Sequence, residues 1–263
     1  MREFTTLKLE IEDDLGIIWL NKPDNSNTYN EVMMTELIDV FKYVNKIAEI
    51  KIIILKGRGK TFCAGPDLNW LKDVAKYSYE QNYFESLLFS KCLYEIYSCK
   101  KPTIAVIHGS AIDGGIGFFA ACDFAFCNEE TIFSVTDVNM GLIQACIAPY
   151  IMKRVGEFGT KELMFTGKRI KGSEAETLKL VNKSLSKSQL DEYVNETIEQ
   201  LRTSGPSALT FCKNLIYDIA NTQSIDESIE YTAKLIADIR ATDEGQEGLN
   251  AFLKKRKPYW IKN

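Results

Sequence analysis

Histidine is nearly absent from this chain of 263 residues, which has a single one, His108. A zinc or other transition-metal site usually draws on several histidine or cysteine ligands at close spacing. The seven cysteines are scattered along the chain and form no C-x-x-C pair. We therefore expect no metal site, and we expect the cysteines to be free thiols of a reducing compartment.

Long apolar runs are also missing. No segment approaches the roughly 18 consecutive apolar residues of a membrane-spanning helix, and the N-terminus lacks the charged start and apolar block of a secretory signal. The net charge of −4, with both signs interspersed, argues against nucleic acid as a partner. The longest basic run, residues 254–257 (KKRK), is either a solvated helix end or a phosphate site. These absences predict a cytoplasmic protein that binds neither a membrane nor nucleic acid.

Two catalytic signatures are absent as well. The nucleophile elbow G-x-S-x-G does not occur, which argues against a serine hydrolase that would use His108 as its base. We interpret His108 as either a structural histidine or a general base. The second glycine turn of the chain, residues 109–117, does not contain the dinucleotide fingerprint G-x-G-x-x-G.

The order of apolar patterns predicts an α/β core followed by helices. Period-two alternation at 7–11 and 15–20 predicts a hairpin, and a helical face begins near Asn30. Short apolar runs predict further strands at 51–56, 103–108, 122–127 and 131–135. Helical patterns follow at 158–166, 173–180 and 187–203, and after Gly205 only helices remain. We place the boundary there, with a core at 1–204 and a helical C-terminal region at 205–263.

A first glycine turn at residues 61–69 (TFCAGPDLN) directly follows the apolar run 52–55. A turn between a strand and a helix start can present backbone N–H groups to an anion or a polarised carbonyl. Pro66 has no N–H to offer at this point. Asp67 is expected to cap the helix that follows.

The second glycine turn repeats this pattern after the next strand. Gly114 and Gly115 open a helix of small residues, which indicates either close packing or an anion site. Two such turns could converge on one carbonyl oxygen, which is the geometry of an oxyanion hole.

A reaction that moves protons also needs an acid or a base. Asp137 lies between the apolar Val135 and Val138, so it is either a partly buried acid with a raised pKa or a helix N-cap. We expect Asp113 and Asp123 to have turn or capping roles.

These stretches together resemble the crotonase superfamily, the enoyl-CoA hydratases and isomerases, over nearly the whole chain. The match lies in LNKP at 20–23 with Asn27 and Asn30, in 57–68 (GRGKTFCAGPDL), in 101–109 (KPTIAVIHG), in Gly114-Gly115 with 121–123 (ACD), and in 140–142 (MGL). Residues 67–70 (DLNW), Gly117 and 147–150 (IAPY) are most similar to the branch that includes methylglutaconyl-CoA hydratases. The resemblance implies a spiral of ββα units with a helical C-terminal trimerisation region, assembled as a homotrimer or a hexamer.

The resemblance also implies a site. In the family an acyl-CoA thioester is the substrate, coenzyme A enters only as part of it, and two backbone N–H groups bind the enolate oxygen. By matched position these donors fall on Pro66, which lacks one, and Gly114. The two glutamates of the hydratases fall on Gly117 and Asp137.

Coenzyme A is implied to lie along the first turn. The residues implied to line it are Ala64, which meets the adenine with its backbone, together with Asp67 and Leu68. Lys60, Arg58 and the run 254–257 are the candidates for its phosphates, the last from a neighbouring subunit.

The resemblance thus predicts an enoyl-CoA hydratase that uses one carboxylate on a 2-enoyl or branched glutaconyl thioester. The alternatives are an isomerase or decarboxylase of the same superfamily, or a catalytically impaired acyl-CoA-binding protein.

Overall fold

The computed structural model describes residues 3–261 and divides into two compact units. Unit 1 comprises Met1–Cys99 and Thr103–Val194, and unit 2 comprises Lys100–Pro102 and Asn195–Asn263. The division falls inside helix α7 (Lys187–Arg202). The boundary that the sequence suggests, at Gly205, coincides with the N-cap of the next helix.

A six-stranded sheet forms the centre of unit 1, in the order β1-β2-β3-β4-β6-β9. The first two strands are an antiparallel hairpin and every other neighbouring pair is parallel. Leu55 of β3 lies opposite Ile18 of β2 and Ala105 of β4. The strands are β1 (Leu7–Glu12), β2 (Leu15–Leu20), β3 (Ile52–Gly57), β4 (Thr103–Ile107), β6 (Phe124–Asn128) and β9 (Lys183–Leu185).

A smaller sheet joins β5 (Ser110–Ile112), β7 (Ile132–Ser134) and β8 (Ile170–Lys171). The sequence pattern does not reveal β5, because it lies inside the stretch read as one glycine turn. Its three residues gain strand structure by pairing with β7 and, at Ala111, with Cys63. The second glycine turn is therefore shorter than expected and begins after Ile112.

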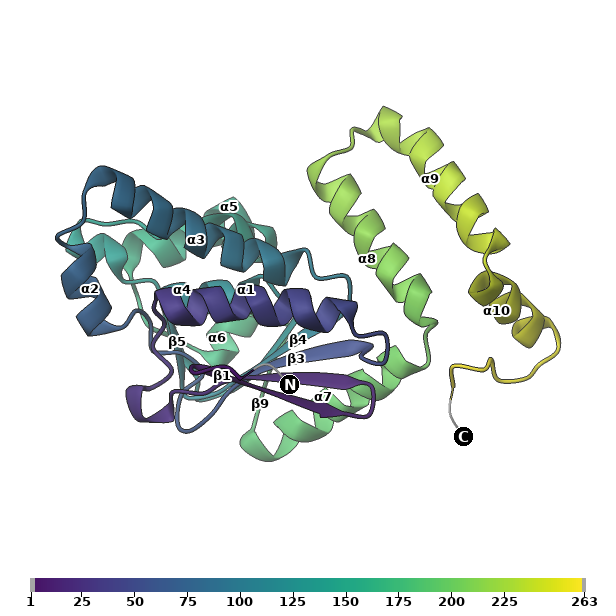
Figure 1. Ribbon diagram of the computed structural model, residues 1–263, viewed down its shortest axis with the longest axis horizontal. Coiled ribbons are helices and arrows are strands. Elements are labelled where there is room, and N and C mark those ends of the chain that lie inside the picture. The colour runs from purple at the N-terminus through teal and green to yellow at the C-terminus, as the bar shows by residue number, and fades with distance from the viewer. Residues whose placement is uncertain (1–2, 262–263) are drawn as a thin grey trace. The chain divides into compact units, whose positions relative to one another are not determined.

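Helix α1 (Glu31–Lys46) begins where the sequence predicts, since the Asn30 side chain accepts a hydrogen bond from Met33 N. It lies alongside α3 (Tyr79–Tyr97) in Figure 1. The buried face of α1 includes Met33 and Met34, while Val32 is exposed.

Four further helices complete unit 1 outside α7. The expected helix at 158–166 is the second half of α5, which begins ten residues earlier. Gly156 has a φ of 70° and interrupts the helix, so only the part after it shows a regular pattern. The helices are α2 (Leu68–Val74), α4 (Gly114–Ala120), α5 (Ala148–Thr166) and α6 (Gly172–Thr177).

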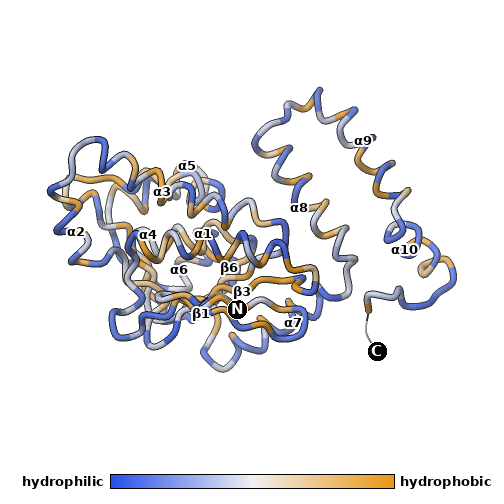
Figure 2. The backbone as a smooth tube through the Cα atoms, in the orientation of Figure 1, coloured by the Kyte–Doolittle hydropathy of each residue, from blue (hydrophilic) through white to orange (hydrophobic). Residues whose placement is uncertain are grey.

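Unit 2 consists of helices, as the sequence predicts for its part of the chain. Pro206 starts α8 at a position where a helix needs no N–H, and Ser224 closes a capping box at the start of α9. Hydrophobic and hydrophilic positions alternate along α8 and α9 in Figure 2. The helices are α8 (Pro206–Asn221), α9 (Ile225–Ala241) and α10 (Asp243–Leu253).

Candidate active site

The two glycine turns converge, as the sequence predicts. Cys63 of the first turn pairs in parallel with Ala111 of β5. Cys63 N donates to Ser110 O at 3.1 Å, and Ile112 N donates to Cys63 O at 3.0 Å. The first turn is therefore fixed to the strand that leads directly into the second turn.

Tyr29 holds the other edge of the first turn. Its N–H donates to Gly65 O at 3.0 Å, and its carbonyl accepts from Asp67 N at 2.8 Å. In a trans peptide group the C=O bond and the N–H bond point in opposite directions. Since Gly65 O faces Tyr29, the nitrogen of Pro66 faces the opposite edge, where Cys63 meets β5. A donor at position 66 would therefore point toward the second turn, and proline supplies none there.

The second turn is strained and tightly packed. Asp113, the N-cap of α4, has a φ of 49°, an uncommon conformation for a residue other than glycine. Its carboxylate stabilises this geometry by accepting a hydrogen bond from Thr136 N at 2.6 Å. The first N–H groups of a helix have no acceptor in their own helix. Within residues 3–261 the backbone hydrogen bonds assign none to Gly114 N–H or Gly115 N–H.

Asp137 lies beside this turn as the first residue of a 3₁₀ turn (Asp137–Met140). The N-cap is Thr136, so the capping alternative for Asp137 is wrong. Only 7% of Asp137 is exposed. Burial and the nearby charge of Asp113 raise the pKa of Asp137 to about 6, against a hydrogen bond from Gln144. A carboxyl group with this pKa can both accept and release a proton near neutral pH.

The position of the first hydratase glutamate, which falls on Gly117, is closed. A Cβ atom on Gly117 would lie 2.5 Å from Ile147 Cγ2 and 3.1 Å from Leu93 Cδ2. All residues of α4 are buried. Apolar side chains thus fill the space that a glutamate would need, and Asp137 remains the carboxylate available for one-carboxylate chemistry.

The residues expected to line coenzyme A differ in their exposure and in their hydrogen bonds. Asp67 caps α2 by accepting from Asn69 N at 2.9 Å, and it lies 3.7 Å from the ammonium of Lys22. Lys60 is exposed, and Leu68 is 74% exposed. Ala64 N donates to Ser26 O, so a contact from Ala64 to adenine must use its carbonyl.

Two of the expected phosphate ligands already have acidic partners. The Arg58 guanidinium donates to Glu10 at 2.7 Å and stacks on Trp19. Arg256 of the basic run 254–257 forms a bidentate pair with Glu247 at 2.6 and 2.7 Å. The sequence does not mark Lys22 as a phosphate ligand, although its ammonium group lies beside the first turn, 3.7 Å from the Asp67 carboxylate.

His108, Asp123 and Cys63 are the other side chains that could act as acids, bases or nucleophiles, and each lies among structural contacts. His108 Nε2 lies 3.0 Å from Gly59 O, and Asp123 accepts from Thr103 N at 2.7 Å. Burial raises the pKa of the Cys63 thiol to about 12, so this cysteine stays protonated. No group of three or more histidine, cysteine or acidic side chains in residues 3–261 could hold a metal ion. In the same residues no helix is both long and apolar enough to cross a membrane.

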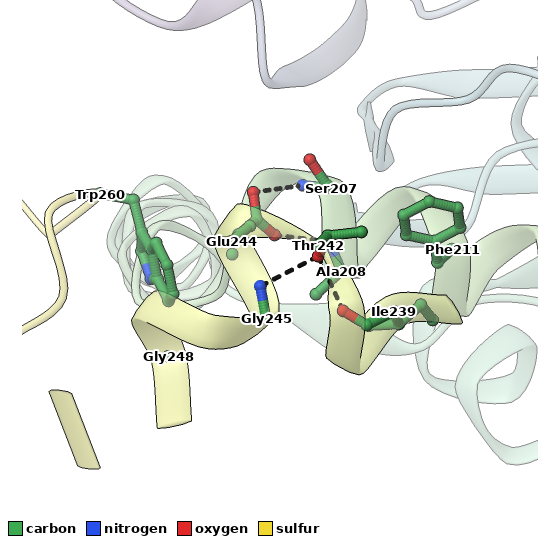
Figure 3. Close-up of a pocket in the computed structure, with 10 residues that line it drawn as sticks. Ser207, Ala208, Phe211, Ile239, Thr242, Glu244, Gly245, Gly248 and Trp260 are labelled. Atoms are coloured by element: carbon green, nitrogen blue, oxygen red, sulfur yellow. Dashed lines mark hydrogen bonds between the residues drawn. The ribbon is translucent and has the colours of Figure 1, made fainter. Parts of the chain in front are cut away.

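A pocket of about 200 Å³ lies within unit 2 (Figure 3). The Glu244 carboxylate in it accepts from Ser207 N and Ala208 N, which caps α8. Thr242 accepts from Gly245 N and caps α10. Since these polar groups serve helix ends and the other walls are mainly apolar, the pocket offers no group for proton transfer.

Sequence reasoning missed two polar side chains at the converging turns. Tyr29 is 3% exposed, and a methyl group on Gly114 would lie 2.5 Å from its hydroxyl oxygen. Gln144 interacts with both Tyr29 and Asp137. In the sequence, Gln144 stands out only as a polar residue within the apolar run 142–150.

A mixed α/β fold with two converging glycine turns beside a buried carboxylate is the arrangement expected of the crotonase superfamily. The family model described as "Enoyl-CoA hydratase/isomerase" matches residues 10–263, so the chain belongs to this family of enzymes. This confirms the resemblance to the superfamily, and the solved structure described below confirms the fold class. The branch that includes methylglutaconyl-CoA hydratases and the trimeric assembly stay predictions.

Individual relatives align with this chain over nearly its full length. The peroxisomal Delta(3,5)-Delta(2,4)-dienoyl-CoA isomerase of Arabidopsis thaliana is 30% identical and covers 100% of this chain and 99% of its own. The crotonyl-CoA hydratase of Syntrophomonas wolfei is 28% identical over 98% of both chains. The crystal structure of an enoyl-CoA hydratase from Shewanella pealeana superposes with a TM-score of 0.94 at 31% identity, covering 98% of this chain and 97% of its own.

Proposed function

We propose that this chain hydrates a CoA thioester whose acyl group is a 2-enoyl or a branched glutaconyl-type group. The observation that carries the proposal is the buried Asp137 carboxyl group, whose pKa of about 6 makes it a proton carrier beside the second glycine turn. The closed position at Gly117 supports a mechanism with this carboxylate alone.

In the proposed reaction Gly114 N–H donates to the thioester oxygen. Asp137, ionised, takes a proton from water while the water oxygen bonds to C3 of the substrate. The electrons of the C2–C3 double bond move toward the thioester oxygen and form an enolate. Asp137 then returns the proton to C2, which completes the addition of one water. A bridging water can extend the reach of the short aspartate side chain.

We also propose that coenzyme A lies along the first turn. The Ala64 carbonyl would accept from the adenine, Asp67 and Leu68 would line the ribose and pantetheine, and Lys60 would meet the phosphates. Trp70 supports a ligand at this place, because its indole Nε1 is buried without a hydrogen-bond partner among the described residues. The cofactor enters with the substrate, and the protein holds no permanent one.

The proposed assembly is a homotrimer or a dimer of trimers in the cytoplasm. Its support is the set of large apolar side chains exposed in unit 2, since exposed apolar surface marks interaction sites. They include Ile216, Ile225, Ile229, Ile236, Phe252 and Leu253.

In the deciding experiment the enzyme is incubated with straight and branched 2-enoyl-CoA and 3-enoyl-CoA thioesters, and the masses of the products are measured by mass spectrometry. Hydration adds the mass of one water. Asp137→Asn is expected to lower turnover at least ~10²-fold, the size of a general acid–base contribution. The exposed Asp191→Asn in α7 is the control and should keep full activity. Full turnover by Asp137→Asn on every accepted substrate would refute the proposal.

A second candidate is isomerisation or decarboxylation within the same superfamily. The 30% identity to a dienoyl-CoA isomerase favours it, as does the single carboxylate. Isomerisation leaves the product mass unchanged, and decarboxylation lowers it. Acyl-CoA binding without turnover, with activity appearing in Pro66→Ala, would instead identify an impaired acyl-CoA-binding protein.

A further inference from the structure

Tyr29 joins the two glycine turns through different parts of the same residue. Its backbone forms both hydrogen bonds that flank Pro66 in the first turn. Its side chain reaches the second turn, where the ring and the hydroxyl pack against the Cα atom of Gly114. Tyr29 therefore contacts both turns: its backbone lies beside Pro66, on the edge opposite the missing donor, and its side chain lies beside Gly114.

The ring of Tyr29 is held in one orientation by three aromatic neighbours. It stacks on Phe89 with ring centroids 5.1 Å apart, and it meets Phe118 and Trp70 edge-on at 5.6 and 5.7 Å. Such packing fixes where the hydroxyl points without using the hydroxyl itself. A donor placed in this way loses little conformational entropy when a substrate binds.

The hydroxyl lies in a buried environment that contains several titratable groups. Asp113, Asp137, the Cys63 thiol and the Gln144 side chain all influence its ionisation. Burial, with these acidic groups, raises the pKa of Tyr29 well above its usual value of 10, so the phenol keeps its proton. A buried protonated phenol among carboxyl groups can donate a hydrogen bond to an oxygen that gains negative charge.

We propose that the Tyr29 hydroxyl is a catalytic donor that binds the thioester oxygen in place of the N–H that Pro66 cannot supply. The oxyanion hole of this chain then consists of one backbone N–H, from Gly114, and one side-chain O–H. The inference rests on the proposed binding of an acyl-CoA thioester.

Tyr29→Phe tests the proposal because it removes only the hydroxyl and keeps the aromatic packing. We expect kcat to fall ~10²-fold with little change in KM, the size of effect seen when one oxyanion donor is lost. Tyr97→Phe is the matched control, since Tyr97 is a half-buried tyrosine in an aromatic pair with Tyr150 in the same unit. Its kcat should remain at the wild-type value. An unchanged kcat in Tyr29→Phe would overturn the proposal.

A spectroscopic measurement separates this inference from the hydratase assignment. The carbonyl stretch of a bound, unreactive saturated acyl-CoA falls in frequency as donors polarise it. We expect a smaller fall in Tyr29→Phe than in the wild type or Tyr97→Phe. This readout does not depend on turnover, so it can succeed even if the enzyme proves not to be a hydratase. Equal carbonyl frequencies in all three proteins would refute the role of Tyr29.

The double variant tests the substitution for Pro66 directly. Pro66→Ala returns an N–H to the edge that faces the second turn. If the hydroxyl stands in for this donor, Tyr29→Phe should cost less in the Pro66→Ala background than in the wild type. Equal costs in both backgrounds would mean that the two positions act independently, and the proposal would be wrong.

Discussion

At the scale of single residues, Asp137 shows how function and stability oppose each other. The same burial and the same neighbouring Asp113 charge that make it a proton carrier disfavour its ionised form. Hydrogen bonds from Thr136 N and Thr136 Oγ1 hold the Asp113 carboxylate, whose charge contributes to this cost.

We predict that Asp137→Asn is more stable than the wild type at neutral pH. The pKa in the folded protein, about 6, exceeds the usual 3.8. The ionised side chain therefore destabilises the fold fully above about pH 6 and not at all below about pH 4. The gain in the free energy of unfolding should be roughly 2–3 kcal/mol at pH 8 and should vanish toward pH 4. Urea unfolding of both proteins at several pH values measures it, and a gain that is constant with pH would contradict the prediction.

Gly117 leads to a second prediction at this scale. Gly117→Glu restores the residue that two-glutamate hydratases have, yet its side chain meets Ile147 and Leu93 in a buried helix. We expect a loss of about 3 kcal/mol or more in the free energy of unfolding and no gain in activity. The cost of burying a charge adds to the cost of the steric overlap. The double variant Gly117→Glu/Ile147→Ala is compared with this single variant, because it removes the Ile147 side chain that the new glutamate would meet first. A stable and faster Gly117→Glu single variant would show that the space is open.

At the scale of elements, short segments gain their structure from caps and pairings. Helix α2 has seven residues, none of them buried, and depends on the Asp67 carboxylate at its N-terminus. Strand β5 depends in the same way on its parallel neighbours. These two elements flank the first and second turns, so the geometry of the site depends on weak local structure.

We predict that Asp67→Ala loosens α2 without unfolding the core. Losing an N-cap costs about 1 kcal/mol, and here the Lys22 pairing is lost too. Hydrogen exchange should become faster at residues 68–74 and stay unchanged in β3, while KM for an acyl-CoA rises. Asp67→Asn keeps a capping oxygen and should exchange like the wild type. Unchanged exchange in Asp67→Ala would show that the cap is unimportant.

At the scale of the whole molecule, the two units differ in how they bury apolar surface. The central strands β3 and β4 of unit 1 are almost entirely buried, and large side chains such as Phe41 and Phe118 are fully buried. Helices α8 and α9 have no buried residues within this single chain. A surface of this kind is expected to be covered by other copies of the chain.

Light scattering of the purified protein is expected to give the mass of three or six copies. Ile229→Lys and Ile236→Lys, which place charges on α9, should lower this mass. Ile11→Lys on β1 is the control, because Ile11 is also partly exposed but belongs to unit 1. A monomeric wild type would contradict the proposed assembly.

Local patterns account for most of what the sequence could predict. The Asn30 cap, the strand runs at 52–55 and 103–107, and the helices after Gly205 depend on near neighbours in the chain, so their signals are local. The two turns and Asp137 were also identifiable, because glycine, proline and an isolated acid in an apolar stretch each have a local physical meaning. By contrast, β5 and the first half of α5 have no such signal.

The sequence by itself determined the α/β class, the two glycine turns, the missing donor at Pro66 and the family. Only the tertiary structure decided which groups meet at those turns. Tyr29, Gly114 and Asp137 come from three separate segments of the chain. The pairings of Tyr29 with Pro66, of Cys63 with Ala111 and of β5 with β7 bring these segments together. The closed space at Gly117 depends equally on Ile147, thirty residues further along the chain. Such contacts follow from packing in three dimensions, and no local pattern encodes them.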